Sequence, residues 1–257
     1  MTIILATLAL ALSSAAASYP ASQPVPPPDI AWVTREIKAP RVSFHTFDSA
    51  AVSAVRGKTP SATQTASARV SYHLYTPTAY ETEPTRRFPV VYWLHGSGGG
   101  LRGIPRLARH FDAAIEADKT PPFLVVFVNG LENGMYCNWK DGSVPLETVI
   151  IEELLPHVDT TYRTVATRDG RLLDGFSMGG YGAARLGFKY PHLFRSVSLM
   201  GAGPLQPELT QAPRATVRGR EAILKRVYGN DQTYFRVVSP WQLAADNAAR
   251  TKAAQEA

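Results

Sequence analysis

Residues 171–189 read RLLDGFSMGGYGAARLGFK, and the order of residue types in this stretch decides the fold class. Arg171–Phe176 is a short, mostly apolar run that predicts a buried β-strand, and the GYGAARLGFK that follows is compatible with a helix. Between them, Gly175, Ser177 and Gly179 match the pattern G-x-S-x-G. A serine between a strand and a helix, with glycines two positions away on each side, is typical of a nucleophile elbow.

A steric requirement explains the two glycines of this turn. A serine hydroxyl is a poor nucleophile at its ordinary pKa and must be presented where a base can reach it. A sharp strand-to-helix turn presents it, but the tight packing leaves no room for side chains at Gly175 and Gly179. Ser177 is therefore the candidate nucleophile. The alternative is a glycine-rich turn that only packs a helix onto a sheet.

A second glycine-rich loop, HGSGGG, follows the predicted strand Phe88–Leu94. In this loop Gly96 and Gly98 would let the backbone approach a carbonyl oxygen closely. The backbone N–H groups of Ser97 and Met178 would then point at one oxyanion, which is a large contribution to acyl-transfer catalysis. The loop predicts an oxyanion hole, with the preceding His95 as a brace.

The same loop also matches a dinucleotide-binding pattern, because Gly98, Gly100 and Gly103 fit G-x-G-x-x-G. That reading needs an acidic residue at the end of the next strand to hold the ribose. Here the next strand ends in VNG at residues 128–130. The oxyanion interpretation therefore fits better, and no cofactor is expected.

Further apolar segments extend the pattern in both directions. Alternating segments predict half-buried strands, and continuous apolar runs predict parallel strands buried on both faces. The alternating segments are Arg41–Phe47 and Ala68–Thr76, with a polar loop expected between them; the continuous runs are Phe88–Leu94, Phe123–Val128, Arg171–Phe176 and Phe194–Met200. Helices are expected over about Arg106–Asp118, over Leu146–Tyr162 with a kink at Pro156, and after Ser177. This alternation predicts a doubly wound, mostly parallel sheet with helices on both faces.

The N-terminal region is expected to lie outside this domain. Residues 1–28 carry no Lys, Arg, Asp or Glu, and an apolar run is followed by small residues, with alanines at positions 15 and 17. This pattern predicts a signal peptide over residues 1–17, and the proline-rich residues 18–30 predict a linker. Residues 31–257 are then the folded domain of a secreted or periplasmic protein.

Composition narrows the function classes. With 45% hydrophobic residues and one cysteine, the chain is neither disordered nor a disulfide framework. A net charge of +6 is mild for 257 residues, and no nucleic-acid motif accompanies it. The six histidines show no metal-ligand spacing, so no metal is expected.

The expected partner is a small-molecule or polysaccharide-linked ester. Neither nucleic acid nor a stable membrane anchor is expected, and the oligomeric state stays open. Cys137 is expected to be a packed side chain.

Several motifs together resemble one family. In chain order they are VSYHLYTPTAYE, FPVVYWLHGSGG, the Trp139 loop, ETVIIEELLPHVDTTYRT, RDGRLLDGFSMGGYGAARLGFKYPHLF and VSPWQLA. From about Arg41 onward the chain resembles the esterase family of α/β-hydrolases that includes esterase D, feruloyl and acetyl-xylan esterases and mycolyltransferases. The resemblance implies that Ser177 is the nucleophile and that Ser97 and Met178 form the oxyanion hole. It also implies that Tyr136 and Trp139 line the substrate site.

The C-terminal part departs from the family pattern. An α/β-hydrolase carries its acid and then its histidine after the nucleophile. After Ser177 the only histidine is His192, beyond the far end of the elbow helix, and neither Asp231 nor Asp246 follows a strand. The C-terminal strands that hold the acid and the base are therefore expected to be missing.

Three explanations remain for this departure. The sequence is part of a longer esterase, or a short form with another base such as His95, or a catalytically inactive binding protein. The main expectation is a secreted serine carboxylic-ester hydrolase acting on feruloyl, acetyl or similar small-acyl esters. An acyltransferase of the same fold is the close alternative.

Overall fold

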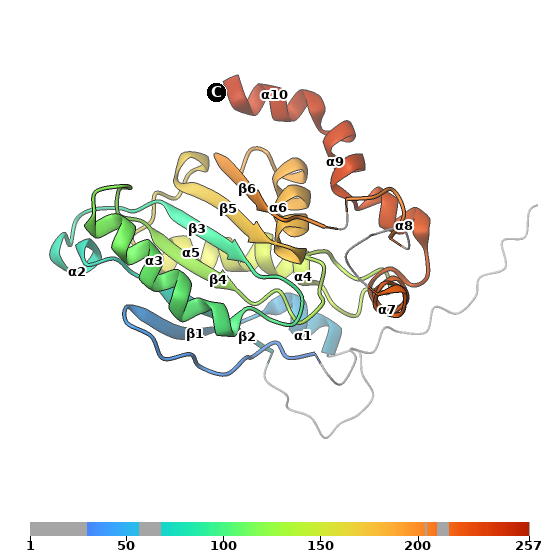
Figure 1. Cartoon of the computed structure of the whole chain (residues 1–257), viewed down its shortest axis with the longest axis horizontal. Coiled ribbons are helices and arrows are strands. Elements are labelled where there is room, and N and C mark those ends of the chain that lie inside the picture. The colour runs from blue at the N-terminus through green and yellow to red at the C-terminus, as the bar shows by residue number, and fades with distance from the viewer. Residues whose placement is uncertain (1–29, 57–67, 204, 210–215, 257) are drawn as a thin grey trace, which may run out of the picture.

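The computed structural model describes residues 30–56, 68–203, 205–209 and 216–256, so the expected signal peptide and most of the expected linker lie outside the described residues. A six-stranded sheet in the order β1-β2-β4-β3-β5-β6 forms the centre (Figure 1). Strands β1, β2 and β4 are antiparallel neighbours, whereas β4, β3, β5 and β6 run parallel. The strands are β1 Val42–Asp48, β2 Arg69–Tyr75, β3 Val90–Leu94, β4 Leu124–Val128, β5 Arg171–Phe176 and β6 Ser196–Met200.

Helices cover both faces of the sheet. They are α1 Ala50–Arg56, α2 Ala79–Thr82, α3 Ile104–Glu116, α4 Leu146–Thr148, α5 Leu155–Thr161, α6 Met178–Lys189, α7 Val217–Tyr228, α8 Gln232–Val237, α9 Pro240–Asp246 and α10 Ala248–Glu256. Short η1 Leu101–Gly103 and η3 Arg168–Gly170 are 3-10 turns, and η2 Val149–Leu154 is a π-helical segment.

Alternate residues of β3 show how the two layers form. Trp93 packs with Ile104 and Ala108 of α3 on one face, whereas Tyr92 and Leu94 belong to the large core formed with α5 and α6 on the other. Successive strand residues point to opposite faces, so one strand serves both cores. The predicted doubly wound α/β fold is thereby confirmed.

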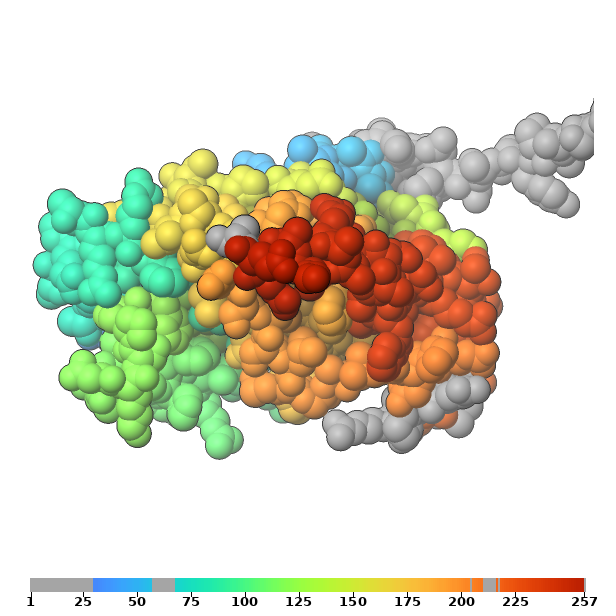
Figure 2. Space-filling model, turned by 90° about the horizontal axis from the view of Figure 1, so that it is seen from above, coloured from blue at the N-terminus to red at the C-terminus, as the bar shows by residue number. Residues whose placement is uncertain are grey.

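Strand β6 corrects one expectation. The run Phe194–Met200 was expected to be a strand buried on both faces, but all five residues of β6 are exposed. Val197 and Leu199 are 39% and 45% exposed. The reason is position, because β6 is the last strand of the sheet and pairs only with β5. Seen from the side on which α10 lies, α9 and α10 run across the molecule above β6 and α6 (Figure 2).

Helix α1 corrects a second expectation. Its residues fall in the segment expected to be a polar loop. The sequence pattern did not predict a helix here, although Val52 and Val55 lie three positions apart and are both buried. Ser49 accepts a hydrogen bond from the N–H of Val52 and donates one to Glu153, so the helix start is tied to η2.

The helical run around Pro156, where a kink was expected, changes its hydrogen-bond pattern. The helical run from Leu146 to Thr161 is π-helical over η2 and returns to an α-helix at Leu155. Proline has no N–H to donate within a helix, and the change from the π-helical to the α-helical pattern occurs next to Pro156.

A buried ion pair joins the layers behind α6. Arg185 is 1% exposed and binds the Glu147 carboxylate at 2.5 Å. Its other N–H groups donate to the carbonyl oxygens of Tyr136 and Val238. Burial alone would raise the pKa of the Glu147 carboxyl, but Arg185 and the neighbouring Lys189 hold that pKa below its usual value. Glu147 is therefore ionised, and Arg185 connects three separate segments.

This geometry predicts a large cost for Arg185→Met. The substitution leaves two carbonyl oxygens without a donor and weakens the pairing of a buried carboxylate, so the free energy of unfolding should fall by about 3 kcal/mol. Urea unfolding measures it, with Arg195→Met as the control. The Arg195 side chain is half exposed, and its contact with Asp169 is 3.8 Å long. Equal unfolding midpoints for the two variants would contradict the assigned role.

A second prediction concerns His73, which is 2% exposed and accepts a hydrogen bond from the N–H of Ile37 at its Nε2 atom. Burial lowers the pKa of His73 to about 4, although Glu36 opposes the shift. The unfolded chain binds this proton near pH 6.5. Stability from neutral His73 is therefore full above about pH 6.5 and is lost as the pH falls towards 4, by at most about 1.4 kcal/mol per pH unit.

His73→Gln keeps an acceptor near Ile37 but cannot be protonated in this range. Its unfolding free energy should depend less steeply on pH between 6.5 and 4.5 than that of the wild type. His110→Gln, which changes an exposed histidine, is the matched control. Parallel pH profiles for wild type and His73→Gln would refute the argument.

Candidate active site

Ser177 lies at the sharp turn between β5 and α6. Its backbone has φ 57° and ψ −116°, a conformation that non-glycine residues rarely adopt. The turn is held by its own backbone, because the Ser177 N–H donates to Met200 O at 2.8 Å and its carbonyl accepts from Tyr181 N at 3.0 Å. Such strained residues concentrate at functional sites, where the surroundings over-determine them.

The glycines around Ser177 are required by space. A Cβ atom on Gly179 would lie 1.8 Å from the carbonyl oxygen of Leu94, and one on Gly175 would lie 2.2 Å from the carbonyl oxygen of Gly179. The start of α6 therefore touches the end of β3 directly. This contact brings the turn next to the loop that follows β3.

That loop lies against the serine. A Cβ atom on Gly96 would be 3.2 Å from the Cβ of Ser177. Ser97 follows in an exposed turn, and Gly98 has φ 87°, which favours glycine. The Gly98 N–H donates to Glu132 O at 2.8 Å and so anchors the turn. The structure thus brings the HGSGGG loop and Ser177 together.

Two backbone N–H groups at this junction are the candidate oxyanion donors. Within the described residues, the Ser97 N–H makes no backbone hydrogen bond. The Met178 N–H belongs to the first turn of α6, where N–H groups have no partner within the helix. Their assignment as an oxyanion hole stays a prediction.

His95 is a neutral cross-link within this loop. It is 5% exposed, its Nδ1 donates to Gly96 O at 2.7 Å, and its Nε2 accepts from the Gly130 N–H at 3.1 Å. The Gly130 donor requires an unprotonated Nε2, and burial correspondingly lowers the pKa of His95. Both nitrogens are occupied by backbone groups, so the alternative in which His95 is the base for Ser177 does not fit. The expected bracing role does.

Tyr136 supports the same loop from beneath. It is fully buried, and its hydroxyl donates to His95 O at 2.9 Å. Its ring packs so closely against Gly130 and Gly182 that a Cβ atom on either glycine would overlap it. In this position it contacts the loop rather than open space. Its role as a substrate-lining residue stays a prediction.

Trp139 and Cys137 continue this buried segment. Trp139 is 4% exposed and borders a cavity of about 80 Å³, and the Arg226 guanidinium lies 5.2 Å from its ring centre. Its role as a substrate-lining residue also stays a prediction. Cys137 is fully buried, and burial raises the pKa of its thiol to about 11. The expected packed, unreactive cysteine agrees with this environment.

The later acid and base candidates lie elsewhere. Asp231 caps α8 and pairs with Lys140, and Asp246 accepts from Gln242 within α9. His192 is exposed beyond the end of α6. Among the residues that the structure describes, none hydrogen-bonds the Ser177 hydroxyl.

Sequence reasoning missed Arg185. A signal existed, because Arg185 is the only charged residue between Met178 and Leu186, a segment of otherwise small or apolar residues. A lone charge in such a helix has to be paired when the helix is buried.

Two absences apply to the described residues only. They contain no group of three or more His, Cys, Asp or Glu side chains placed to hold a metal ion. None of their helices is both long enough and apolar enough to cross a membrane.

Comparison with known proteins identifies the family. Residues 63–256, about three quarters of the chain, match the family described as "Putative esterase". An endo-1,4-beta-xylanase/feruloyl esterase of Xylanibacter ruminicola is 32% identical over 138 residues, which make up 50% of this chain and 18% of that protein. The chain spans at most about a quarter of the length of the curated relatives it matches.

Solved structures share the fold. A ferulic acid esterase has a TM-score of 0.59 at 19% identity, covering 83% of this chain and 74% of that one. The fluorophosphonate-binding serine hydrolase F (FphF) of Staphylococcus aureus has a TM-score of 0.57 at 15% identity, covering 81% and 74%. Because the family match covers most of the chain, this chain belongs to that esterase family.

Proposed function

We propose that this protein hydrolyses carboxylic esters through an acyl-enzyme on Ser177. The observation that carries the proposal is the strained backbone of Ser177, held by close glycine contacts against the HGSGGG loop. A strained serine at the start of a helix, next to a glycine-rich loop whose Ser97 N–H makes no backbone hydrogen bond within the described residues, has the geometry that acyl transfer needs.

The chemistry follows from this arrangement. The Ser177 oxygen attacks the ester carbonyl carbon, and the N–H groups of Ser97 and Met178 hold the negative charge that develops on the carbonyl oxygen. The C–O bond to the alcohol then breaks, and the departing alcohol takes up the proton that the serine gives up. Water hydrolyses the acyl-serine, which releases the acid and restores the hydroxyl.

The proposed substrates are feruloyl, acetyl or similar small-acyl esters, including esters linked to polysaccharide. The feruloyl esterase named among the relatives and the ferulic acid esterase among the similar folds support this class. Secretion or periplasmic export is part of the same proposal. It is supported by the apolar run and small residues within residues 1–17.

A covalent probe tests the nucleophile. A fluorophosphonate should label the wild-type chain once, at Ser177, and Ser177→Ala should abolish both labelling and p-nitrophenyl acetate turnover, by at least about 10³-fold. The matched control is Ser196→Ala, which removes an exposed serine hydroxyl in β6. Labelling at another residue, or unchanged turnover by Ser177→Ala, would overturn the assignment. A folded chain that is not labelled would instead support the inactive binding protein.

A further inference from the structure

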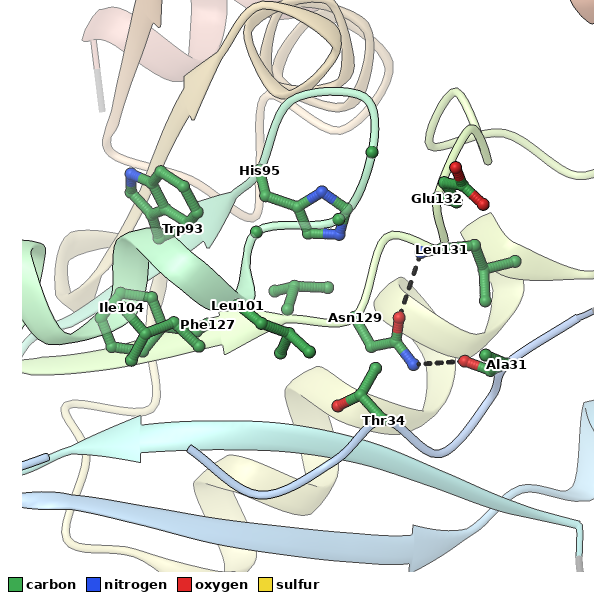
Figure 3. Close-up of a pocket in the computed structure, with 14 residues that line it drawn as sticks. Ala31, Thr34, Trp93, His95, Leu101, Ile104, Phe127, Asn129, Leu131 and Glu132 are labelled. Carbon is green, nitrogen blue, oxygen red and sulfur yellow. Dashed lines mark hydrogen bonds between the residues drawn. The ribbon is translucent and has the colours of Figure 1, made fainter. Parts of the chain in front are cut away.

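A second cavity lies behind the glycine turn. Its volume is about 190 Å³, and residues from the N-terminal segment, β3, the glycine turn, η1, α3 and the end of β4 line it. In Figure 3 the glycine turn arches over the His95 ring, with Leu101 and Asn129 below it and Glu132 on the side of His95 away from Trp93. No residue of the Ser177 turn contributes to the lining.

The walls of this cavity are mainly apolar and aromatic. Trp93, Leu101, Ile104, Phe127 and Leu131 supply most of the side chains. An apolar cavity of about 150 Å³ holds one benzene ring. The volume here is therefore enough for one aromatic ring with a short aliphatic arm.

Most polar groups on the walls are already paired. The Asn129 amide donates to Ala31 O and Trp32 O, and its oxygen accepts from the Leu131 N–H. Both nitrogens of His95 are bound to backbone groups, and the Thr34 hydroxyl contacts Ser71. A ligand with several hydrogen-bonding groups would therefore find few partners at these three side chains.

Two groups of the lining are exceptions. The buried Nε1 of Trp93 has no hydrogen-bond partner among the residues that the structure describes. The backbone carbonyl of Glu132 holds Gly98, but the exposed Glu132 side chain makes no hydrogen bond or ion pair with any described residue. A carboxylate at the mouth of an apolar cavity attracts a cation whose hydrocarbon part is buried inside.

We propose that this cavity is a binding site for a single-ring aromatic amine, with the ring among the apolar walls and the ammonium group at Glu132. The site is separate from Ser177, because no residue of the Ser177 turn lines the cavity. It is therefore a non-catalytic site. Its test needs no esterase activity, so its failure and that of the proposed function are distinguishable.

Two probes with one carbon skeleton test the charge. 2-Phenylethylamine carries an ammonium group at neutral pH, whereas 2-phenylethanol is neutral. Each is titrated into the full chain and followed by calorimetry or protein NMR. For ligands of this size the expected Kd is on the order of 1 mM. The amine should bind about threefold more tightly than the alcohol, because the carboxylate is exposed to solvent.

Three variants locate the site. Glu132→Gln should abolish the preference for the amine and leave the affinity for the alcohol unchanged. Ala31→Trp fills the mouth with a bulky ring and should remove binding of both probes. Val33→Trp, two residues away at an exposed position that does not line the cavity, should leave both affinities unchanged. Unfolding midpoints confirm that each variant is folded.

Each outcome either supports or overturns the proposed amine site. A preference for the amine that needs Glu132, with binding that is blocked only by Ala31→Trp, supports the proposal. It is overturned if neither probe binds the wild type. It is also overturned if Ala31→Trp still binds them, or if the preference survives in Glu132→Gln.

Discussion

The contact between Gly179 and the carbonyl oxygen of Leu94 sets the geometry of the candidate site. No side chain fits between the start of α6 and the end of β3, so the backbones of the two elements touch. The strained Ser177 and the HGSGGG loop therefore emerge from neighbouring parallel strands at one edge of the sheet. Ligands of open α/β sheets bind at this carboxyl edge. The same contact explains why Ser177 can keep its unfavourable φ angle, since neither flanking element can move away.

Two buried polar groups hold this junction from behind. His95 joins the loop to the end of β4 through Gly130, and Tyr136 caps the carbonyl of His95. Arg185 then fixes the carbonyl of Tyr136 while its charge is balanced by Glu147. The chain of contacts runs from the glycine loop to the core and on to the carbonyl of Val238, between α8 and α9. Each member is satisfied, which is the condition under which buried polar groups rigidify a structure.

The cavity behind the glycine turn follows from the same construction. Glycines at positions 98 and 99 have positive φ angles and carry no side chain to fill the space beneath them. The His95 ring is fixed by its two hydrogen bonds and cannot turn inward to close it. The glycine turn therefore leaves an apolar hollow beneath it. Glu132, whose backbone anchors that turn, brings the only carboxylate of the lining to the mouth.

Much of the fold could be predicted from the sequence because the signals were local. Period-two and continuous apolar runs identified all six strands, and G-x-S-x-G between a strand and a helix located the elbow. The prediction failed where local pattern does not carry the information. The apolar run of β6 resembles a central strand, and only the order of the sheet makes it an exposed edge. The short helix α1 was missed because its two buried valines become meaningful only with Glu153 packed against its start.

The sequence by itself determined the fold class, the position of Ser177 and the glycine spacing around it. These features depend on residue types at short separations, where backbone sterics decide what is possible. Only the tertiary structure decided that His95 is neutral and occupied, that Tyr136 is a buried support, and that Arg185 and Glu147 pair. Those facts depend on burial and on partners about 35 to 50 positions away, because desolvation and hydrogen bonding are set by neighbours in space.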